Sequence, residues 1–294
     1  MKRPRPSRSL AVVAALLLAL PSPAAAREPK PETLAAFRHY RELTEARMAA
    51  DLAADHFFRI DALSPERRAA ALLQLKNGEF YLEQLHTLEG GRNIPVPSGL
   101  IHHWVGVGFL PNTTLAETRA IIEDYDHEKE NYFPDVRKSR LVSSDGHRQE
   151  VFLQLYSRTV VTAVFNVNFA SETSELSPTR VQVRSCSTRV ADVEDFGKPS
   201  ERELPLNESR GYLWELCTWW HLEEKDGGTY MQVEAIELSR TVPIAFAWLV
   251  NPIIKNVPKT FLSRLLSETR TAVEKRRKSK SPATPSQAPA PATS

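Results

Sequence analysis

Apolar positions recur at helical spacing among many charged residues between residues 30 and 76. The first predicted helix has its apolar positions at Leu34, Phe37, Leu43, Met48, Leu52 and Phe57. A second helix is predicted from Pro65, with Ser64 as its N-cap, and it ends at Asn77-Gly78. Because acidic and basic residues are interleaved, the charged faces of both helices are predicted to face solvent rather than nucleic acid.

From residue 100 the pattern changes to that of β-strands. The run LIHHWVGVGFL is followed by a predicted helix over residues 114–133, which opens with a capping box of Thr114 and Glu117. Strand-like runs follow at 136–142, 150–157, 161–170, 179–193, 212–224 and 229–239. The last predicted helix begins at Pro258, and its apolar stripe consists of Phe261, Leu262, Leu265, Leu266, Thr269 and Val273. An antiparallel sheet has a face to bury, so we expect this helix to cover it in an α+β fold.

This order of elements resembles the START-like (SRPBCC) helix-grip superfamily, which includes lipid-transfer domains, pollen-allergen-type proteins and polyketide cyclases. The segments that carry the resemblance are IPVPSGLIHHWVGVGFLPNTTLAETRAIIEDYDHEKENYFPDV, DGGTYMQVEAIELSRTVP and VPKTFLSRLLSETRTAV. They span about residues 95–278 and include no catalytic signature. The resemblance implies a curved antiparallel sheet of about seven strands around a long C-terminal helix, with an apolar cavity between them.

The beginning of the chain has the pattern of a secretory signal peptide. Residues 1–26 combine basic residues from Lys2 to Arg8, an apolar run from Leu10 to Leu20, and small residues ending at Ala26. The protein is therefore predicted to be exported, either periplasmic or secreted. The whole chain has a formal net charge of +2, and removing the four basic residues of this segment leaves −2. Such a balance argues against nucleic acid as a partner.

The predicted organisation has four parts. They are a signal peptide (1–26), an N-terminal helical segment (27–94), the START-like helix-grip domain (95–278) and a disordered tail rich in Pro, Ala and Ser (279–294). The apolar run at 242–250 is too short to span a membrane, and we expect a buried bend or a short helix there.

Alternation sorts the tryptophan-rich strand into two faces. Its uncharged face holds Trp214, Leu216, Thr218, Trp220 and Leu222. The other face, which includes Trp219, is mixed and mostly polar. We therefore expect Trp214 and Trp220 to point toward the core or a cavity, and Trp219 to point toward water.

The turn after this strand predicts the pairing with the next one. A two-residue type I′ turn at Asp226-Gly227 places Trp220 opposite Val233, Thr218 opposite Ala235, Leu216 opposite Glu237 and Trp214 opposite Ser239. A three-residue loop would instead turn Glu237 outward. With the first register, the predicted ligand-binding residues are Trp214, Leu216, Thr218, Trp220, Val233, Ala235, Glu237 and His103. The alternatives are that the indoles fill an ordinary core and that Glu237 forms a structural ion pair.

The candidate chemistry is sparse. The sequence contains no nucleotide-binding loop, zinc-protease motif or nucleophile elbow, so no cofactor or metal is predicted. His102 and His103 are neighbours on a strand and point to opposite faces, so they cannot bind one ion together. His103 is predicted to enter the cavity, with a hydrogen-bonded core histidine as the alternative.

The two cysteines, Cys186 and Cys217, are predicted to form a disulfide between neighbouring antiparallel strands. The register that joins them also pairs Arg184 with Trp219 and Thr188 with Glu215, and it places all of these residues on the polar face.

Three functions are compatible with these features. The first is an exported protein that binds a lipid or another apolar small molecule between the sheet and the last helix. The second is a cyclase- or hydrolase-like enzyme, for which Glu237 and His103 are the only candidate acid/base pair. The third is an envelope interaction module that docks a partner through its N-terminal helices.

A basic cluster lies at the end of the last helix and consists of Lys275, Arg276, Arg277, Lys278 and Lys280. One interpretation is that it contacts anionic membranes. The other is that its positive charges only interact favourably with the dipole at the helix C-terminus.

Overall fold

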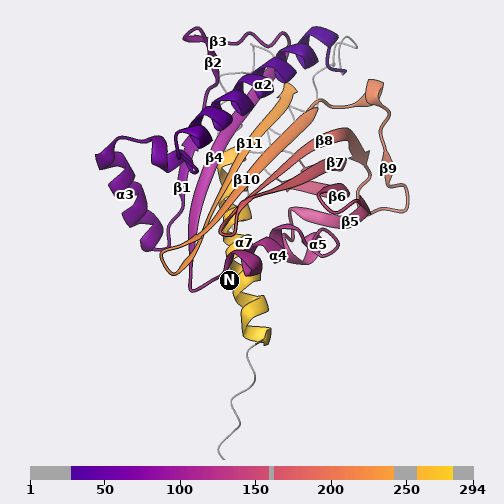
Figure 1. The fold of residues 1–294 in the computed structure, drawn as a ribbon. Coiled ribbons are helices and arrows are strands. Elements are labelled where there is room, and N and C mark those ends of the chain that lie inside the picture. Colours follow the sequence, from indigo (N-terminus) through magenta and orange to yellow (C-terminus); the bar gives the residue numbers. More distant parts are fainter. Residues whose placement is uncertain (1–27, 159–161, 242–256, 281–294) are drawn as a thin grey trace, which may run out of the picture.

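A nine-stranded antiparallel sheet forms the centre of the fold in the computed structural model, which describes residues 28–158, 162–241 and 257–280 (Figure 1). The strands lie in the order β1-β4-β11-β10-β8-β7-β6-β5, and β9 pairs with β8. Their bounds are β1 Tyr81–Gln84, β4 Gly99–Pro111, β5 Val136–Ser144, β6 Arg148–Arg158, β7 Thr162–Ser177, β8 Arg180–Glu194, β9 Arg202–Glu203, β10 Glu215–Lys225 and β11 Gly228–Arg240. The short strands β2 (Leu88–Glu89) and β3 (Arg92–Asn93) form a separate pair. The seven long strands are those predicted from the sequence, and β1 and β9 complete the sheet.

The predicted signal peptide, the apolar run at 242–250 and residues 281–294 of the predicted tail lie outside the described residues. At the boundary of that tail, helix α7 continues to Lys280.

One face of the sheet, called the inner face here, is covered by helix α7 (Val257–Lys280). Leu262, Leu266 and Val273 of the predicted apolar stripe are fully buried in a cluster with strand residues. The helix comes close at Gly106 of β4, where an added Cβ would lie 2.8 Å from Leu266 and 3.1 Å from Leu262. The predicted α+β helix-grip arrangement, with a C-terminal helix on an antiparallel sheet, is confirmed (Figure 1).

The helix predicted over residues 114–133 is broken into α4 (Leu115–Ile122) and α5 (Glu128–Asn131). The capping box of Thr114 and Glu117 is present at the start of α4. The break contains Asp126, whose carboxylate accepts a hydrogen bond from the Leu141 backbone N–H at 2.9 Å. Aspartate side chains compete in this way with helical hydrogen bonds, which explains why one continuous helix was predicted wrongly.

The opposite face of the sheet, called the outer face, is covered by the N-terminal segment. This segment forms α2 (Pro31–Ala53), the 3₁₀ helix η1 (Arg59–Ala62) and α3 (Pro65–Lys76), and α2 crosses in front of the strands in Figure 1 while α7 runs behind them. Phe37, Tyr40 and Met48 of α2 are buried in a cluster with Trp219 and Ile236 of the sheet. The expectation that Trp219 faces water is therefore wrong. Alternation separated the two faces correctly, but it could not show that a second layer covers the polar one.

The hairpin of β10 and β11 has the predicted register. Asp226 and Gly227 have φ angles of 55° and 74°, as a type I′ turn requires. Trp220 pairs with Val233, Thr218 with Ala235 and Leu216 with Glu237. This register places Glu237 on the same face of the sheet as Leu216.

The predicted disulfide between Cys186 and Cys217 is present. It joins β8 to β10, in a register that also pairs Arg184 with Trp219 as predicted. The pairing of these strands ends at the disulfide, so the predicted pair of Thr188 and Glu215 is not formed. The disulfide is buried in the cluster beneath α2.

Candidate ligand-binding site

A cavity of about 110 Å³ lies on the inner face of the sheet, beside the part that α7 covers directly. Trp220, Thr218 and Leu216 of β10 form part of its wall, and Phe261 and Leu265 of α7 form another part. Further apolar lining residues come from α4 and from strands β5 to β8: Ile122, Val136, Val151, Leu153, Leu155, Phe169 and Val183. The cavity therefore lies between the sheet and the C-terminal helix, where the resemblance predicted it.

Carboxyl groups gather at the side of this cavity formed by α5 and α7. Glu128 of α5, Asp135 in the loop before β5, and Glu268 of α7 all line it. Arg264 forms an ion pair with Asp135 at 2.9 Å. Tyr132 lies among these groups, and its hydroxyl is 3.1 Å from the Thr269 hydroxyl. The apolar cavity thus has one acidic side.

Burial changes the acidity of these carboxyls. Desolvation, with a smaller contribution from Asp124, raises the pKa of Glu128 to about 8. Desolvation and the neighbouring Asp135 raise the pKa of Glu268 to about 7. At neutral pH Glu128 therefore carries its proton for most of the time. It can then donate a hydrogen bond to a ligand oxygen as well as accept one.

The eight residues predicted to bind a ligand fall into three groups. Leu216, Thr218 and Trp220 line the cavity. Val233, Ala235 and Glu237 share the inner face but lie outside the lining, and the first two are packed in the apolar cluster under α7. The remaining two, Trp214 and His103, lie elsewhere. The cavity is displaced toward β5–β8 because Gly106 lets α7 pack tightly over β4 and β11.

The prediction that Trp214 lines the cavity is wrong. Strand β10 begins at Glu215, and Trp214 belongs to the cluster that includes Phe37 and Trp219 on the α2 side of the sheet. The strict alternation used for the sequence does not extend to a residue that precedes the strand.

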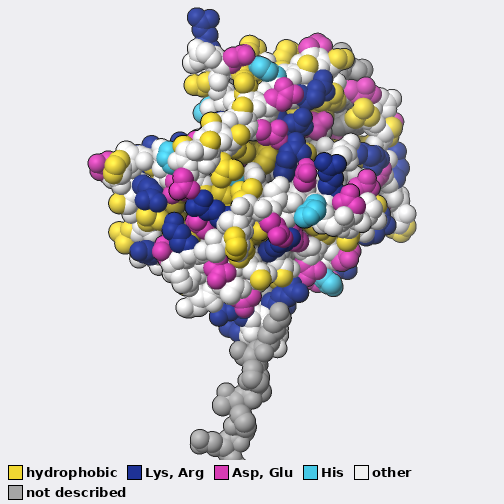
Figure 2. All heavy atoms as spheres, viewed as in Figure 1, with side chains coloured by type: hydrophobic (Ala, Val, Ile, Leu, Met, Phe, Trp, Pro, Cys, Tyr) yellow, Lys and Arg dark blue, Asp and Glu magenta, His cyan; other side chains and the backbone are white. Residues whose placement is uncertain are grey.

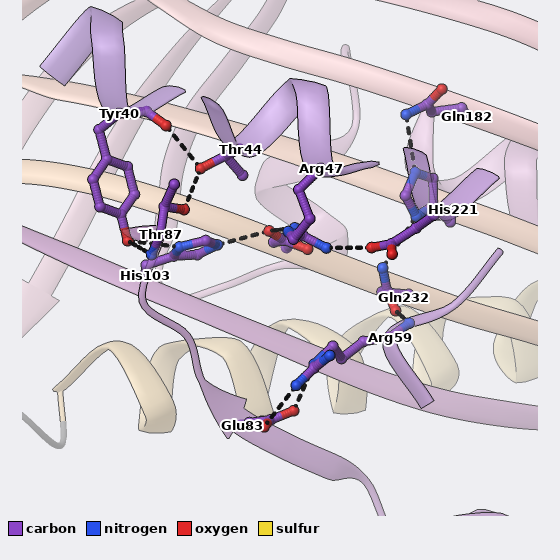
Figure 3. Close-up of polar contacts among 12 residues, drawn as sticks. Tyr40, Thr44, Arg47, Arg59, Glu83, Thr87, His103, Gln182, His221 and Gln232 are labelled. Atoms are coloured by element: carbon purple, nitrogen blue, oxygen red, sulfur yellow. Dashed lines mark hydrogen bonds and ion pairs between the residues drawn. The ribbon is translucent and has the colours of Figure 1, made fainter. Parts of the chain in front are cut away.

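The prediction that His103 enters the cavity is also wrong. In the β4–β11 register His102 pairs with Glu237 and His103 pairs with Ile236, so His103 lies on the outer face. There it is 2.7 Å from Glu234 and 2.9 Å from the Tyr40 hydroxyl (Figure 3). The hydrogen-bonded core histidine, the alternative for this residue, is what the structure shows.

The candidate acid/base pair of Glu237 and His103 is therefore separated by the sheet. Sequence reasoning missed His102, which is the histidine opposite Glu237 on the inner face. Burial lowers the pKa of His102 to about 4 and raises that of Glu237 to about 7. Knowing the β4–β11 register, which the sequence did not supply, would have identified this pair.

The basic end of α7 is only partly free. Arg276 donates to the Ala120 carbonyl at 2.7 Å and lies 3.2 Å from Asp124, and Arg277 lies 3.5 Å from Glu117. Lys275 and Lys278 are exposed. Two of the predicted membrane-contact residues thus bind α4 and the residues that follow it.

Two negative findings concern the described residues. No helix in the described ranges is both long and apolar enough to cross a membrane. Within the same ranges, no group of three or more His, Cys, Asp or Glu side chains is arranged to hold a metal ion.

The comparisons with known proteins found matches only among solved structures. No family model matches the sequence, and no curated protein matches it. The chain is similar to a STAR-related lipid transfer protein fragment from Xanthomonas axonopodis, at 14% identity over 66% of this chain and 98% of that one, with a TM-score of 0.41. It is similar to human STARD10, at 8% identity over 74% of this chain and 83% of that one, with a TM-score of 0.41. It is also similar to the Zhui aromatase/cyclase from Streptomyces sp. R1128, at 10% identity over 60% of this chain and 96% of that one, with a TM-score of 0.40.

All three matches are distant, with identities of 8–14% and TM-scores of 0.40–0.41. At such identities and scores, the ligand and activity of this chain have to be argued from its own residues.

Proposed function

We propose that this protein binds a lipid or another largely apolar small molecule in the inner cavity. The observation that carries the proposal is the composition of the wall, in which Trp220 and several aliphatic side chains face a side that holds Glu128 and Glu268. Ligand sites typically combine a mostly apolar wall with a few polar groups that fix orientation.

The polar groups suggest which end of the ligand lies near α5. A protonated Glu128 donates to a carbonyl or hydroxyl oxygen, and Tyr132 and Thr218 add hydroxyl groups to the same cavity. An apolar body would then lie along Trp220 and Leu216. Burial of apolar surface contributes about 25 cal/mol per Å², so a few hundred Å² offsets a substantial part of the cost of association.

The size of the cavity implies movement of its wall. Cavities of ~150 Å³ hold a benzene-sized molecule, and typical ligand pockets begin near 300 Å³. The present 110 Å³ is smaller than both. Phe261 and Leu265, which form the α7 wall, are only half-buried, whereas Leu262 and Leu266 of the same helix are fully buried. Rotation of the two half-buried side chains away from the sheet would enlarge the cavity without breaking the core.

Export is part of the proposal. It is supported by the signal-like pattern of residues 1–26 and by the disulfide, which suits an oxidising compartment. The alternative interaction module has less support, because α2 buries its apolar side against its own sheet.

The proposal is tested by native mass spectrometry of freshly purified protein, with extraction of any bound molecule, and by uptake of a fluorescent fatty-acid or sterol probe. Trp220→Ala should weaken probe binding and cost less stability than the ~3–5 kcal/mol expected for a tryptophan in a fully packed core. Trp219→Ala is a matched control, because it removes the adjacent indole on the outer face.

Probe binding lost in Trp220→Ala and kept in Trp219→Ala supports the inner cavity. Absence of copurified ligand together with absence of probe uptake by the wild type contradicts the proposal.

A further inference from the structure

A second cavity, of about 330 Å³, lies on the outer face of the sheet. It is bounded by the end of α2, the residues from the end of α2 to the start of η1, and strands β7, β8, β10 and β11. Its lining includes Arg47, Asp51, Phe57, Trp219, His221 and Glu234. Figure 2 shows this side of the molecule, where basic and acidic side chains are intermixed around hydrophobic ones. The sheet separates this cavity from the inner one, so the inference below does not rest on the proposed function.

A chain of hydrogen bonds fixes the orientation of groups behind this cavity (Figure 3). The Thr87 backbone N–H donates to the Tyr40 hydroxyl oxygen at 2.8 Å. Tyr40 is 2.9 Å from His103 Nδ1, and His103 Nε2 is 2.7 Å from Glu234 Oε1. Burial keeps the pKa of His103 below its usual value, so the imidazole is neutral. Glu234 accepts from Nε2–H, and Nδ1 is then left to accept from the Tyr40 hydroxyl.

Glu234 is held as a carboxylate. Burial raises its pKa, but the bonds from His103 and Arg47 outweigh this effect and hold the pKa below its usual range. His103 and Arg47 both bind the same oxygen, Oε1. The other oxygen, Oε2, is buried and has no hydrogen-bond partner among the described residues. The residue is 1% exposed and lines the outer cavity, and an unpaired buried carboxylate oxygen is costly.

The charges around Glu234 do not balance. Arg47 is shared between Glu234 and Asp51, which it contacts at 2.9 Å. His221 is neutral, because burial lowers its pKa to about 4. Two carboxylates therefore share one guanidinium, so these three side chains together carry a net charge of −1.

The other charged residues of the lining have partners of their own. Glu45 pairs with Arg184 at 2.7 Å, Arg59 with Glu83 at 2.9 Å, and Glu172 with Arg148 at 3.5 Å. Glu83 also lies 3.8 Å from the exposed Arg67, and none of these pairs includes Glu234 or Asp51.

Aromatic side chains form another part of the wall. Phe57 lies against the His221 ring with the ring centroids 5.0 Å apart, and Trp219 is 1% exposed. Such rings offer apolar contact to an organic group and attract a cation placed over their faces.

We propose that the outer cavity binds a small organic ammonium, whose N–H group donates to Oε2 of Glu234 and whose apolar body lies against Phe57 and Trp219. A single positive charge balances the excess carboxylate, and its N–H satisfies the open oxygen. A neutral donor of the same shape would satisfy the oxygen and leave the charge unbalanced.

The test is calorimetric titration of the full protein at neutral pH with benzylamine, and with benzyl alcohol as its neutral analogue. We expect saturable one-to-one binding of benzylamine and much weaker binding of the alcohol. Glu234→Gln removes the carboxylate and keeps its shape, and it should weaken benzylamine binding roughly ten- to hundredfold, the weight of a hydrogen bond to a charged group. Glu42→Gln is the matched control, because Glu42 is exposed on the same helix as Arg47 and lies outside the cavity.

Glu234 is buried and holds His103 and Arg47, so Asp51→Asn provides a second variant at the cavity rim. Asp51 has 29% of its side chain exposed, and its neutralisation should weaken benzylamine binding severalfold without unfolding the protein. A saturating fluorescent fatty acid should leave benzylamine binding unchanged.

The proposal is overturned if the wild type shows no saturable binding at concentrations on the order of 10 mM. It is also overturned if benzyl alcohol binds as tightly as benzylamine, because the cavity would then hold a neutral donor such as water. Should Glu234→Gln not fold, unchanged affinity in Asp51→Asn is the result that rejects it.

Discussion

Replacing Glu128 by glutamine isolates the acidity of the inner cavity, because the change removes the titrating group and keeps its shape. Glu128 is 9% exposed. Desolvation, with help from Asp124, raises its pKa from an ordinary 4.5 to about 8. Among the described residues, no cationic side chain forms an ion pair with it. The folded protein therefore holds this proton much more tightly than the unfolded chain does.

The sign and size of the effect follow from proton linkage. A carboxyl whose pKa is raised by folding contributes stability that is fully present below the unfolded pKa and is lost as the pH rises through the folded pKa. Each pH unit between the two values corresponds to about 1.4 kcal/mol. The window from 4.5 to about 8 then amounts to about 5 kcal/mol, most of which is lost between about pH 5 and pH 8.

Urea unfolding of the wild type and Glu128→Gln at several pH values between 5 and 8 measures this loss. The stability of the variant relative to the wild type should rise by about 3–4 kcal/mol across that range. Glu130→Gln, an exposed position on the same short helix, should keep a constant difference. Glu237 and Glu268 titrate equally in all three proteins and cancel in the comparison. Parallel stability curves for the wild type and Glu128→Gln would show that Glu128 has an ordinary pKa, and would remove the protonated donor from the proposed site.

Two further predictions concern other parts of the chain. Reduction of the Cys186–Cys217 disulfide, which closes a loop with a sequence separation of 31, should lower the free energy of unfolding by about 3–4 kcal/mol. Thiol titration in denaturant without reductant should find no free thiol, and two free thiols would contradict the disulfide. Lys275→Glu combined with Lys278→Glu should reduce cosedimentation with anionic vesicles, and so should high salt. Equal binding to neutral vesicles would reject an electrostatic contact.

Local patterns predicted the inner face well. The type I′ turn at Asp226-Gly227 and the alternation of β10 together determine the register that places Leu216, Thr218 and Trp220 on one face. Both signals act between residues close in sequence, so they can be recognised without tertiary information. The acidic side of the cavity could not be predicted in this way. Glu128 and Glu268 lie on separate helices with ordinary charged patterns, and only packing onto the sheet removes their carboxyls from water.

The outer face escaped prediction for a related reason. Gln232 and Glu234 alternate with apolar residues in β11, which is the pattern of a strand with one face in water. Their partners are Arg59 and Arg47, separated from them by 173 and 187 residues. Polar groups on α2 and η1 meet polar groups on the sheet, so both sides of the contact have the composition of solvent-exposed surfaces.

A polar interface between layers is stable only where its donors and acceptors are matched, because each unmatched buried group is costly. Most of the contact under α2 meets this condition, from Thr87 through Tyr40 and His103 to Oε1 of Glu234. Oε2 of Glu234 does not meet this condition, because it has no hydrogen-bond partner among the described residues. Glu234 lines the larger of the two cavities described here. In a network that satisfies its other groups along this chain, an unpaired carboxylate oxygen on a residue that lines a cavity is the feature expected of a site that a ligand completes.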